Sequence, residues 1–179
     1  NWGDPGALFI DRIRNFNLLS GYPEYHIDIT NPCSEFPGNA GNSCNLMSIN
    51  LYNMVGNKFT ESANIDWEKL KSTVSTSVRM LDEILDYGID MQPLDINKQC
   101  ISDWRSIGLG VFGLADAFVA LGIKYGSPKS RLIAGDIMDR IMSAALETSA
   151  LLAKEKGSFR KYDWEKTRHS QIIQSYINE

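Results

Sequence analysis

Three side chains near the start of the chain have the chemistry of a hydrogen-bonding clamp, a redox-capable sulfur and a base: Asn31, Cys33 and Glu35. They stand at every second position of the segment Asn-Pro-Cys-Ser-Glu. Pro32 disfavours helical geometry at the residue before it, which favours an extended segment. Because alternate side chains of an extended backbone lie on one face, the spacing predicts that all three point the same way, spread over roughly 13 Å. A proline turn that holds a buried structural cysteine is the alternative, since a motif this short also arises by chance.

Two further blocks follow the pentapeptide. Ser-Cys-Asn-Leu-Met-Ser-Ile-Asn-Leu begins at Ser43, and Arg-Ser-Ile-Gly-Leu-Gly-Val-Phe-Gly-Leu-Ala-Asp begins at Arg105. In this order and at these separations the three blocks, which together span residues 31–116, resemble the catalytic large subunit of ribonucleotide reductase. The flanking segments 3–6 and 157–164 look similar to the same family. Three ordered blocks are far more specific than any one of them.

The resemblance implies a role for each residue of the first block. The loop 31–35 would be a finger at the centre of a ten-stranded α/β barrel, and Cys33 would become a thiyl radical that abstracts the 3′-hydrogen of the ribonucleotide substrate. Glu35 would act as base on the 3′-hydroxyl, and the Asn31 amide would orient the substrate. Cys44 would be one half of a redox-active pair whose partner lies outside this chain, regenerated by an external thiol reductant such as thioredoxin or glutaredoxin.

The class of reductase is predicted from the spelling of the same blocks. The short gap between Cys33 and Cys44 and the Gly-Leu-Gly-Val-Phe-Gly-Leu-Ala-Asp run look most like the adenosylcobalamin-dependent class, which makes adenosylcobalamin the expected cofactor. No histidine of the chain resembles a dedicated cobalamin ligand. The iron- or manganese-dependent class, whose radical comes from a separate metal-containing subunit, is the alternative. Met47 and Ser106 depart from the residues usual in the family, and Met47 is expected to crowd the strand beside Cys44.

Composition and charge exclude several other classes of protein. The 179 residues are 43% hydrophobic and 22% charged, with a net charge of −4, which is typical of a globular protein and gives no basic surface for nucleic acid or an anionic membrane. No apolar run approaches the eighteen or so residues of a membrane span, and no signal peptide is present. An odd number of cysteines, and two histidines in no ligand pattern, predict a cytoplasmic chain with reduced thiols and no metal site.

The periodicity of apolar residues predicts an α/β chain with little sheet and a mostly helical C-terminal portion. The expected strands cover 24–30 and 44–52. A first helix is expected to start at Asp4–Pro5, and further helices are expected over 67–87, 93–104, 114–121, 128–156 and 164–177. The residues expected to face the core are Leu8, Ile10, Ile13 and Phe16 in the first helix, Leu70, Val74, Val78, Leu81, Ile84 and Leu85 in the second, and Leu132, Ile133, Ile137, Ile141, Ala145, Thr148 and Leu152 in the longest. Gly88, Gly122 and Gly157 are expected to end helices.

The chain is expected to be a single unit over residues 1–179, a fragment of the catalytic barrel of a longer reductase, because two strands are too few to close a barrel. Its expected partners are the ribonucleotide substrate and the remainder of the parent reductase, with a homodimer of that parent left open. Alone it is expected to reduce no nucleotide, because the partner cysteine, the phosphate-binding turn and the allosteric region of the family are absent from it. A catalytically silent fragment remains an alternative.

A nucleotide-binding module is another alternative, because residues 108–113 spell Gly-x-Gly-x-x-Gly. That fingerprint requires a buried strand immediately before it and an acidic residue some twenty positions on, at the end of a second strand. Residues 99–105 do not read as a strand, and the candidate acid, Asp136, falls within a predicted helix. The glycines are therefore interpreted as sites of close approach, and a helix directly before them would eliminate the module. Arg105 is expected to form a structural ion pair, and Cys100 to lie in the core.

Overall fold

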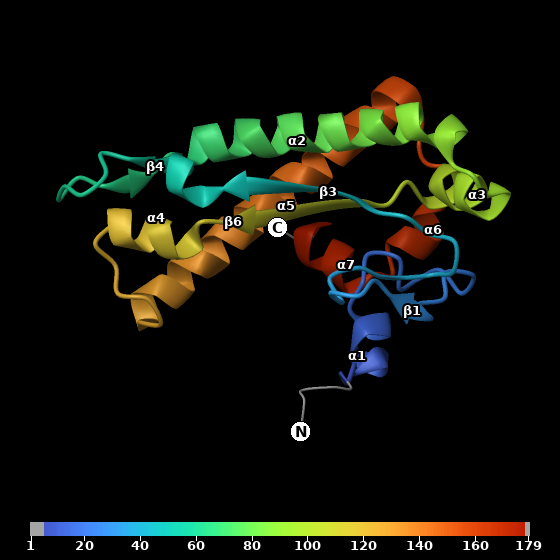
Figure 1. Cartoon of the computed structure of the whole chain (residues 1–179), viewed down its shortest axis with the longest axis horizontal. Helices are drawn as coiled ribbons and strands as arrows, with labels where there is room; N and C mark the ends of the chain where they lie inside the picture. Colours follow the sequence, from blue (N-terminus) through green and yellow to red (C-terminus); the bar gives the residue numbers. More distant parts are fainter. Residues whose placement is uncertain (1–5, 178–179) are drawn as a thin grey trace.

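A two-stranded parallel sheet lies at the centre of the structure, a computed structural model that describes residues 6–177 (Figure 1). Strand β3 (Asn45–Asn50) pairs with strand β6 (Ile107–Phe112), and the six residues of each strand pair in order. Parallel neighbours need a long crossover connection. Here that connection contains helix α2 (Trp67–Gly88) and helix α3 (Asp95–Trp104), so α3 delivers the chain directly to the start of β6.

One face of this sheet is covered by the two longest helices. Helix α2 runs along the sheet, and helix α5 (Pro128–Lys156) crosses it obliquely (Figure 1). Because successive side chains of a strand point to opposite faces, one alternate set of apolar residues packs into the core beneath these helices. The set comprises Ile49, Ile107, Leu109 and Val111. The other alternate set therefore lies on the opposite face.

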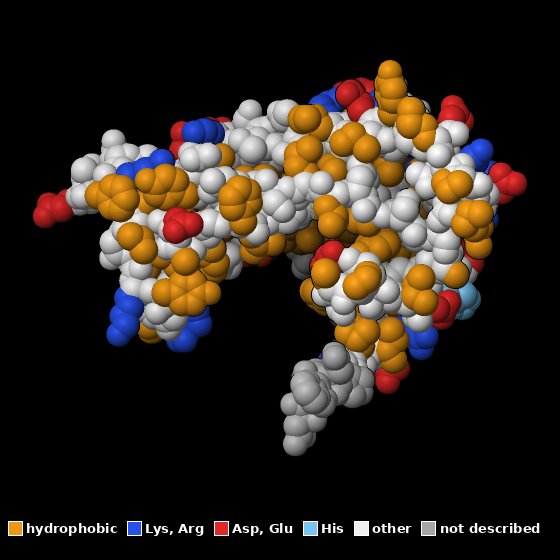
Figure 2. Space-filling view, viewed as in Figure 1, with side chains coloured by type: hydrophobic (Ala, Val, Ile, Leu, Met, Phe, Trp, Pro, Cys, Tyr) orange, Lys and Arg blue, Asp and Glu red, His pale blue; other side chains and the backbone are white. Residues whose placement is uncertain are grey.

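That opposite face is open in the described part of the chain. Leu46 is 60% and Phe112 54% exposed, Ser48 is exposed as well, and Gly108 and Gly110 contribute no side chain. The space-filling view shows a hollow below the sheet, between the lobe that holds the start of α5 and the lobe that holds the N-terminal segment (Figure 2). The sheet is thus half covered.

The two long helices begin as the sequence predicts. The Asp66 side chain accepts a hydrogen bond from the Lys69 N–H at 2.9 Å at the start of α2, and Ser127 accepts one from the Ser130 N–H at 3.2 Å at the start of α5. Gly157 ends α5 with a φ of 90°. Most of the predicted core residues are buried: Leu70, Val74, Val78, Leu81, Leu85, Ile137, Ile141, Thr148 and Leu152.

Two predictions about these helices are wrong. Ile84 is 48% exposed, because it lies at the edge of the α2 stripe that faces the core. Leu132 is 70% exposed, because the N-terminal end of α5 projects away from α2 (Figure 1). Helix α2 ends at Gly88 as predicted, but this glycine has a φ of −85° rather than a left-handed conformation, and the 3₁₀-helix η2 (Ile89–Met91) follows it directly.

The predicted helix 164–177 is two helices, α6 (Trp164–Thr167) and α7 (Gln171–Ile177). The break contains Ser170, which is fully buried and whose hydroxyl donates a hydrogen bond to the Asn17 carbonyl oxygen at 3.0 Å. The helix is interrupted at Ser170, because the buried side chain of this serine is bonded to the N-terminal loop.

Short elements connect the main ones. The 3₁₀-helix η1 (Leu51–Met54) follows β3, and strands β4 (Val55–Gly56) and β5 (Asn64–Ile65) form a hairpin. Helix α4 (Leu114–Ala120) follows β6, and Gly122 after it has a φ of 67°, which confirms the predicted helix end.

The N-terminal segment is less regular than predicted. The expected helix start at Asp4–Pro5 lies outside the described residues. Helix α1 covers only Ile10–Asn15 and buries none of its residues. Leu8 is 48% and Phe16 70% exposed, whereas Ile10 and Ile13 are half-buried, so the predicted apolar side of this helix is only partly covered by residues 6–177.

The predicted strand 24–30 is reduced to β1 (Ile29–Thr30), which pairs antiparallel with β2 (Pro37–Gly38). A turn closed by a hydrogen bond from the Tyr25 N–H to the Tyr22 carbonyl oxygen takes the first residues of the expected strand, and residues 25–28 have no regular secondary structure. The described strands thus form three two-stranded sheets and close no barrel. The chain is α/β as predicted, and the completed ten-stranded barrel stays a prediction. None of the helices in the described residues is long and apolar enough to cross a membrane.

An ion network joins the start of β6 to both long helices. The Arg105 guanidinium lies 2.6 Å from an Asp82 carboxylate oxygen and 2.7 Å from one of Asp86, both on α2. Lys156, near the end of α5, lies 3.0 Å from the second oxygen of each carboxylate. The predicted structural ion pair of Arg105 is therefore confirmed, and it is a four-residue network.

Candidate active site

The predicted site segment forms the tip of a hairpin between β1 and β2. The Asn31 carbonyl oxygen accepts a hydrogen bond from the Ser34 N–H at 3.0 Å, which closes a four-residue turn with Pro32 at its second position. The Asn31 side-chain oxygen accepts a second hydrogen bond, from the Phe36 N–H at 3.1 Å. Ser34 has a φ of 67°. The extended segment expected from the sequence is therefore wrong, because proline also favours the second position of a turn and the Asn31 side chain closes the loop.

The turn still presents the predicted side chains at its tip. Cys33 and Glu35 are exposed, and Asn31 is half-buried at the base of the tip. With its oxygen bonded inside the hairpin, Asn31 makes no further side-chain hydrogen bond to the described residues, so its Nδ2 can donate to a ligand. The hairpin thus carries an exposed thiol, an exposed carboxylate and an amide donor on one turn.

Cys44, just before β3, lies close to this hairpin. Its thiol is half-buried, and its pKa is raised by burial and, to a smaller extent, by the Glu35 carboxylate. The structure therefore brings Glu35 within electrostatic reach of Cys44. The described contacts do not join Cys33 to either residue.

The electrostatic effect of Glu35 on Cys44 leads to a prediction. Replacing Glu35→Gln removes the negative charge that opposes thiolate formation, so the pKa of Cys44 falls and more thiolate is present at a given pH. We expect Cys44 to react about two- to fivefold faster with iodoacetamide near pH 8, since the thiolate is the nucleophile. The rate is measured by peptide mass spectrometry in a Cys33→Ser background.

The matched control is Glu61→Gln, another exposed glutamate, in the loop between β4 and β5. It should leave the Cys44 rate unchanged. An equal or slower rate in the Glu35→Gln variant would show that the two side chains are not coupled.

A hydrogen-bonded cluster that the sequence analysis missed holds the loop between the two cysteines. The Asn42 Nδ2 lies 3.3 Å from the Tyr25 hydroxyl, 3.1 Å from Asn39 Oδ1 and 3.0 Å from Ser106 Oγ. Burial raises the pKa of the Tyr25 hydroxyl, to which Cys44 also contributes. The only sequence signal was the polar loop before Cys44, since the partners come from distant segments.

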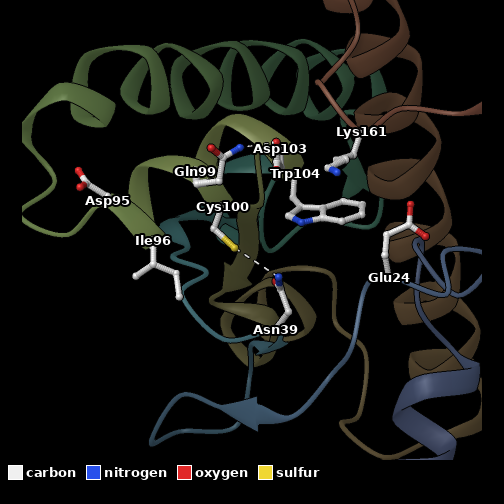
Figure 3. Close-up of a pocket in the computed structure, with 9 residues that line it drawn as sticks. All are labelled: Glu24, Asn39, Asp95, Ile96, Gln99, Cys100, Asp103, Trp104 and Lys161. Carbon is white, nitrogen blue, oxygen red and sulfur yellow. Dashed lines mark hydrogen bonds between the residues drawn. The ribbon is translucent and has the colours of Figure 1, made fainter.

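Cys100 is buried, as predicted, and lines a cleft of about 500 Å³ next to this cluster (Figure 3). Its sulfur accepts a hydrogen bond from Asn39 Nδ2 at 3.3 Å, and burial raises its pKa. Elsewhere in the cleft, Gln99 donates to Asp103 at 2.9 Å. The full lining is Glu24, Asn39, Asp95, Ile96, Gln99, Cys100, Asp103, Trp104 and Lys161. Because several of these polar groups bind one another, we assign the cleft a structural role.

The described residues hold neither a metal cluster nor a dinucleotide site. No group of three or more His, Cys, Asp or Glu among them is placed to bind a metal ion. His26 and His169 are both exposed, and neither belongs to such a group among the described residues. Helix α3 directly precedes β6. Gly108 and Gly110 of the Gly-x-Gly-x-x-Gly run lie within that strand, and Gly113 follows it as the N-cap of α4. This arrangement eliminates the nucleotide-binding module built on that run.

Comparison with known proteins gives a family for the whole arrangement. Residues 1–178 match the family described as the ribonucleotide reductase barrel domain. The chain is 39% identical over 157 residues to a vitamin B12-dependent ribonucleoside-diphosphate reductase of Mycobacterium tuberculosis, covering 88% of this chain and 21% of the relative. It is 36% identical over 166 residues to the protein of that name from Thermoplasma acidophilum, covering 91% and 21%.

Reductase chains that are not named as vitamin B12-dependent also match. The ribonucleoside-diphosphate reductase subunit alpha of Chlamydia pneumoniae is 35% identical over 141 residues, covering 76% of this chain and 13% of the relative. The chain thus spans about a fifth, or less, of the length of these curated relatives.

Proposed function

This chain belongs to the ribonucleotide reductase barrel-domain family, and from this premise we propose that it supplies the catalytic finger of a reductase that makes deoxyribonucleotides. The observation that carries the proposal is the hairpin tip, which exposes Cys33 and Glu35 while Asn31 closes the turn. We call the longer polypeptide that carries this sequence the parent reductase. The remaining strands of the parent are proposed to pair with the free edges of β3 and β6 and so to complete the barrel.

The proposed reaction begins at Cys33. A thiyl radical on its sulfur takes the hydrogen atom from C3′ of the ribonucleotide, so that an S–H bond forms and the C3′–H bond breaks. Glu35 takes the proton of the 3′-hydroxyl, and the 2′-hydroxyl takes a proton from one of a pair of thiols and leaves as water. The other thiol gives a hydrogen atom to C2′, and one electron from the resulting disulfide radical anion, with the proton held by Glu35, converts the 3′-ketone back to a hydroxyl. The Asn31 Nδ2 donates a hydrogen bond to the substrate and orients the sugar. Cys33 finally returns a hydrogen atom to C3′ and becomes a thiyl radical again.

The two electrons for this reduction come from two thiols, which become a disulfide. Cys44 is proposed as one of them, and its partner lies outside this chain. The raised pKa of Cys44 keeps it as the protonated thiol near neutral pH, the form that carries the hydrogen the reaction consumes. An external dithiol such as thioredoxin or glutaredoxin then reduces the disulfide by thiol exchange.

We propose the adenosylcobalamin-dependent class, in which the cofactor would supply the initiating radical. The support is that relatives named as vitamin B12-dependent match at 36% and 39% identity. The second candidate is the class with a separate metal-containing subunit, favoured by the match to an alpha subunit. Nucleotide reduction by the parent that depends on added adenosylcobalamin would support the first class. Reduction that requires a metal-loaded second subunit would replace it with the second.

The role of Cys44 is tested by Cys44→Ser in the parent reductase. Serine cannot form the disulfide, so we expect deoxyribonucleotide formation to fall to background. Removal of the 3′-hydrogen needs only Cys33, so release of tritium from 3′-labelled substrate to water should persist. Both products are measured in one assay, with Cys100→Ala as control because this buried thiol bonds only to the Asn39 amide and the Ala40 carbonyl oxygen, neither of which is a proposed reacting group. Undiminished deoxyribonucleotide formation by Cys44→Ser would remove Cys44 from the reaction.

A further inference from the structure

The sulfur of Cys44 lies over a glycine of the neighbouring strand. Gly108 is the second residue of β6 and pairs with Leu46 on the open face of the sheet. A Cβ added at Gly108 would lie 2.8 Å from the Cys44 Sγ and 2.4 Å from the Leu46 Cδ2, both closer than real Cβ atoms approach. The space that a side chain would occupy at this position is therefore already filled by the thiol and by the Leu46 methyl group.

The next glycine on the same face provides a comparison. A Cβ added at Gly110 would meet nothing closer than the Ser48 Oγ at 3.4 Å, which is an ordinary contact. Both glycines lie in β6 on the same face of the sheet, where Gly108 is half-buried and Gly110 exposed. Only Gly108 is required to be small by the sulfur.

We propose that Gly108 is a positioning residue for Cys44: its missing side chain creates the place in which the redox-active sulfur lies. The proposal rests on the proposed function, because that function is what gives Cys44 a redox role. The Leu46 side chain is 60% exposed and its Cδ2 is the free end of a flexible group, so it can rotate away from a new methyl group. The sulfur has one rotatable bond and must leave its half-buried position.

The test is Gly108→Ala, made in the full 179-residue chain in a Cys33→Ser background. A sulfur displaced toward solvent loses the burial that keeps it protonated, so we expect its reaction with iodoacetamide near pH 8 to become several-fold faster. Tryptic cleavage after Arg14, Lys58, Lys98 and Arg105 separates the Cys44 peptide from the Cys100 peptide, which serves as internal reference. Gly110→Ala should leave the Cys44 rate unchanged.

A second variant keeps the test decisive if Gly108→Ala folds poorly. In Leu46→Ala/Gly108→Ala the contact with the leucine is gone, and the sulfur is the only atom that a Cβ at residue 108 would approach within 3.0 Å. The double variant should therefore melt close to the Leu46→Ala single variant and still show the faster Cys44 reaction. An unchanged Cys44 rate in the folded double variant would overturn the proposal.

The same substitution in the parent reductase separates this inference from the proposed function. Gly108→Ala should reduce deoxyribonucleotide formation while release of the 3′ label persists, a split that a merely structural defect would not produce. If the alkylation rate changes but Cys44→Ser reduces nucleotides normally, the redox role of Cys44 is wrong and the positioning by Gly108 stands. If the alkylation rate does not change, the positioning role is wrong whatever the activity.

Discussion

Cys33→Ser in the parent reductase is expected to abolish both deoxyribonucleotide formation and release of the 3′ label. The hydroxyl has nearly the shape of the thiol, but its O–H bond is much stronger than an S–H bond, so serine supplies no equivalent radical. Because Cys33 is exposed at the hairpin tip, the free energy of unfolding should change by no more than about 0.5 kcal/mol. Product chromatography and a thermal melt on the same sample measure both quantities.

The neighbouring residue provides the control for this prediction. Ser34 is exposed and has a φ of 67°, a conformation that glycine adopts without strain. Ser34→Gly should therefore keep the hairpin and the activity. Normal nucleotide reduction by Cys33→Ser would disprove the thiyl assignment. The two measurements also distinguish Cys33 from Cys44. Cys33→Ser should abolish both deoxyribonucleotide formation and release of the 3′ label, whereas Cys44→Ser should abolish only the first.

Arg105→Met is expected to lower the free energy of unfolding by about 2–3 kcal/mol, the largest stability effect that we predict. The guanidinium is 25% and the Asp82 carboxylate 14% exposed, so removing the cation leaves a largely desolvated carboxylate with only Lys156 as partner. Urea denaturation of the 179-residue chain measures the loss. Arg131→Met is the control, because Arg131 is exposed and makes one long hydrogen bond, at 3.4 Å to a carbonyl oxygen.

A glycine at the same position separates the ion network from backbone strain. Arg105 has a φ of 46°, which is unfavourable for residues with a Cβ. Arg105→Gly loses the same ion pairs but relieves the strain, so it should be more stable than Arg105→Met by up to about 1 kcal/mol. Equal stability of Arg105→Met and the unmodified chain would show that the network contributes nothing.

The pH dependence of stability provides an independent measure of the network. Hydrogen bonding from Arg105, and then from Lys156, lowers the pKa of the Asp86 carboxyl below its ordinary value of 3.8. A carboxylate with a lowered pKa stabilises the folded state above its ordinary pKa, and this contribution is lost as the pH falls through the lowered value. Stability of the unmodified chain should therefore fall more steeply below pH 3.8 than stability of Arg105→Met.

Local signals in the sequence were sufficient for the main helices and for the family. Ser127 followed by proline begins α5, and Gly157 ends it, because capping depends on residues adjacent in sequence. The three blocks between residues 31 and 116 identified the reductase family, which the match over residues 1–178 confirms. The roles of Asn31, Cys33, Glu35 and Cys44 stay predictions.

Local sequence signals gave wrong predictions where the same residue type is common in two different backbone structures. Pro32 predicts an extended segment but stands in a turn, because the Asn31 side chain and the β1–β2 pairing close a hairpin around it. The strand expected over 24–30 is formed only at Ile29–Thr30, and residues 25–28 have no regular secondary structure. In both cases the alternating pattern is present, but no neighbouring strand pairs with the full segment.

The sequence by itself determined the family, the candidate reacting residues and the long helices, because each depends on residue type or on near neighbours. Only the tertiary structure decided that the Glu35 carboxylate raises the pKa of the Cys44 thiol and that Gly108 leaves space for the Cys44 sulfur. Those proximities arise from the hairpin and from the parallel pairing of β3 with β6, which join segments far apart in the chain. The pairing of β3 with β6 is favoured because it buries one face of both strands under α2 and α5, and no short sequence pattern predicts it.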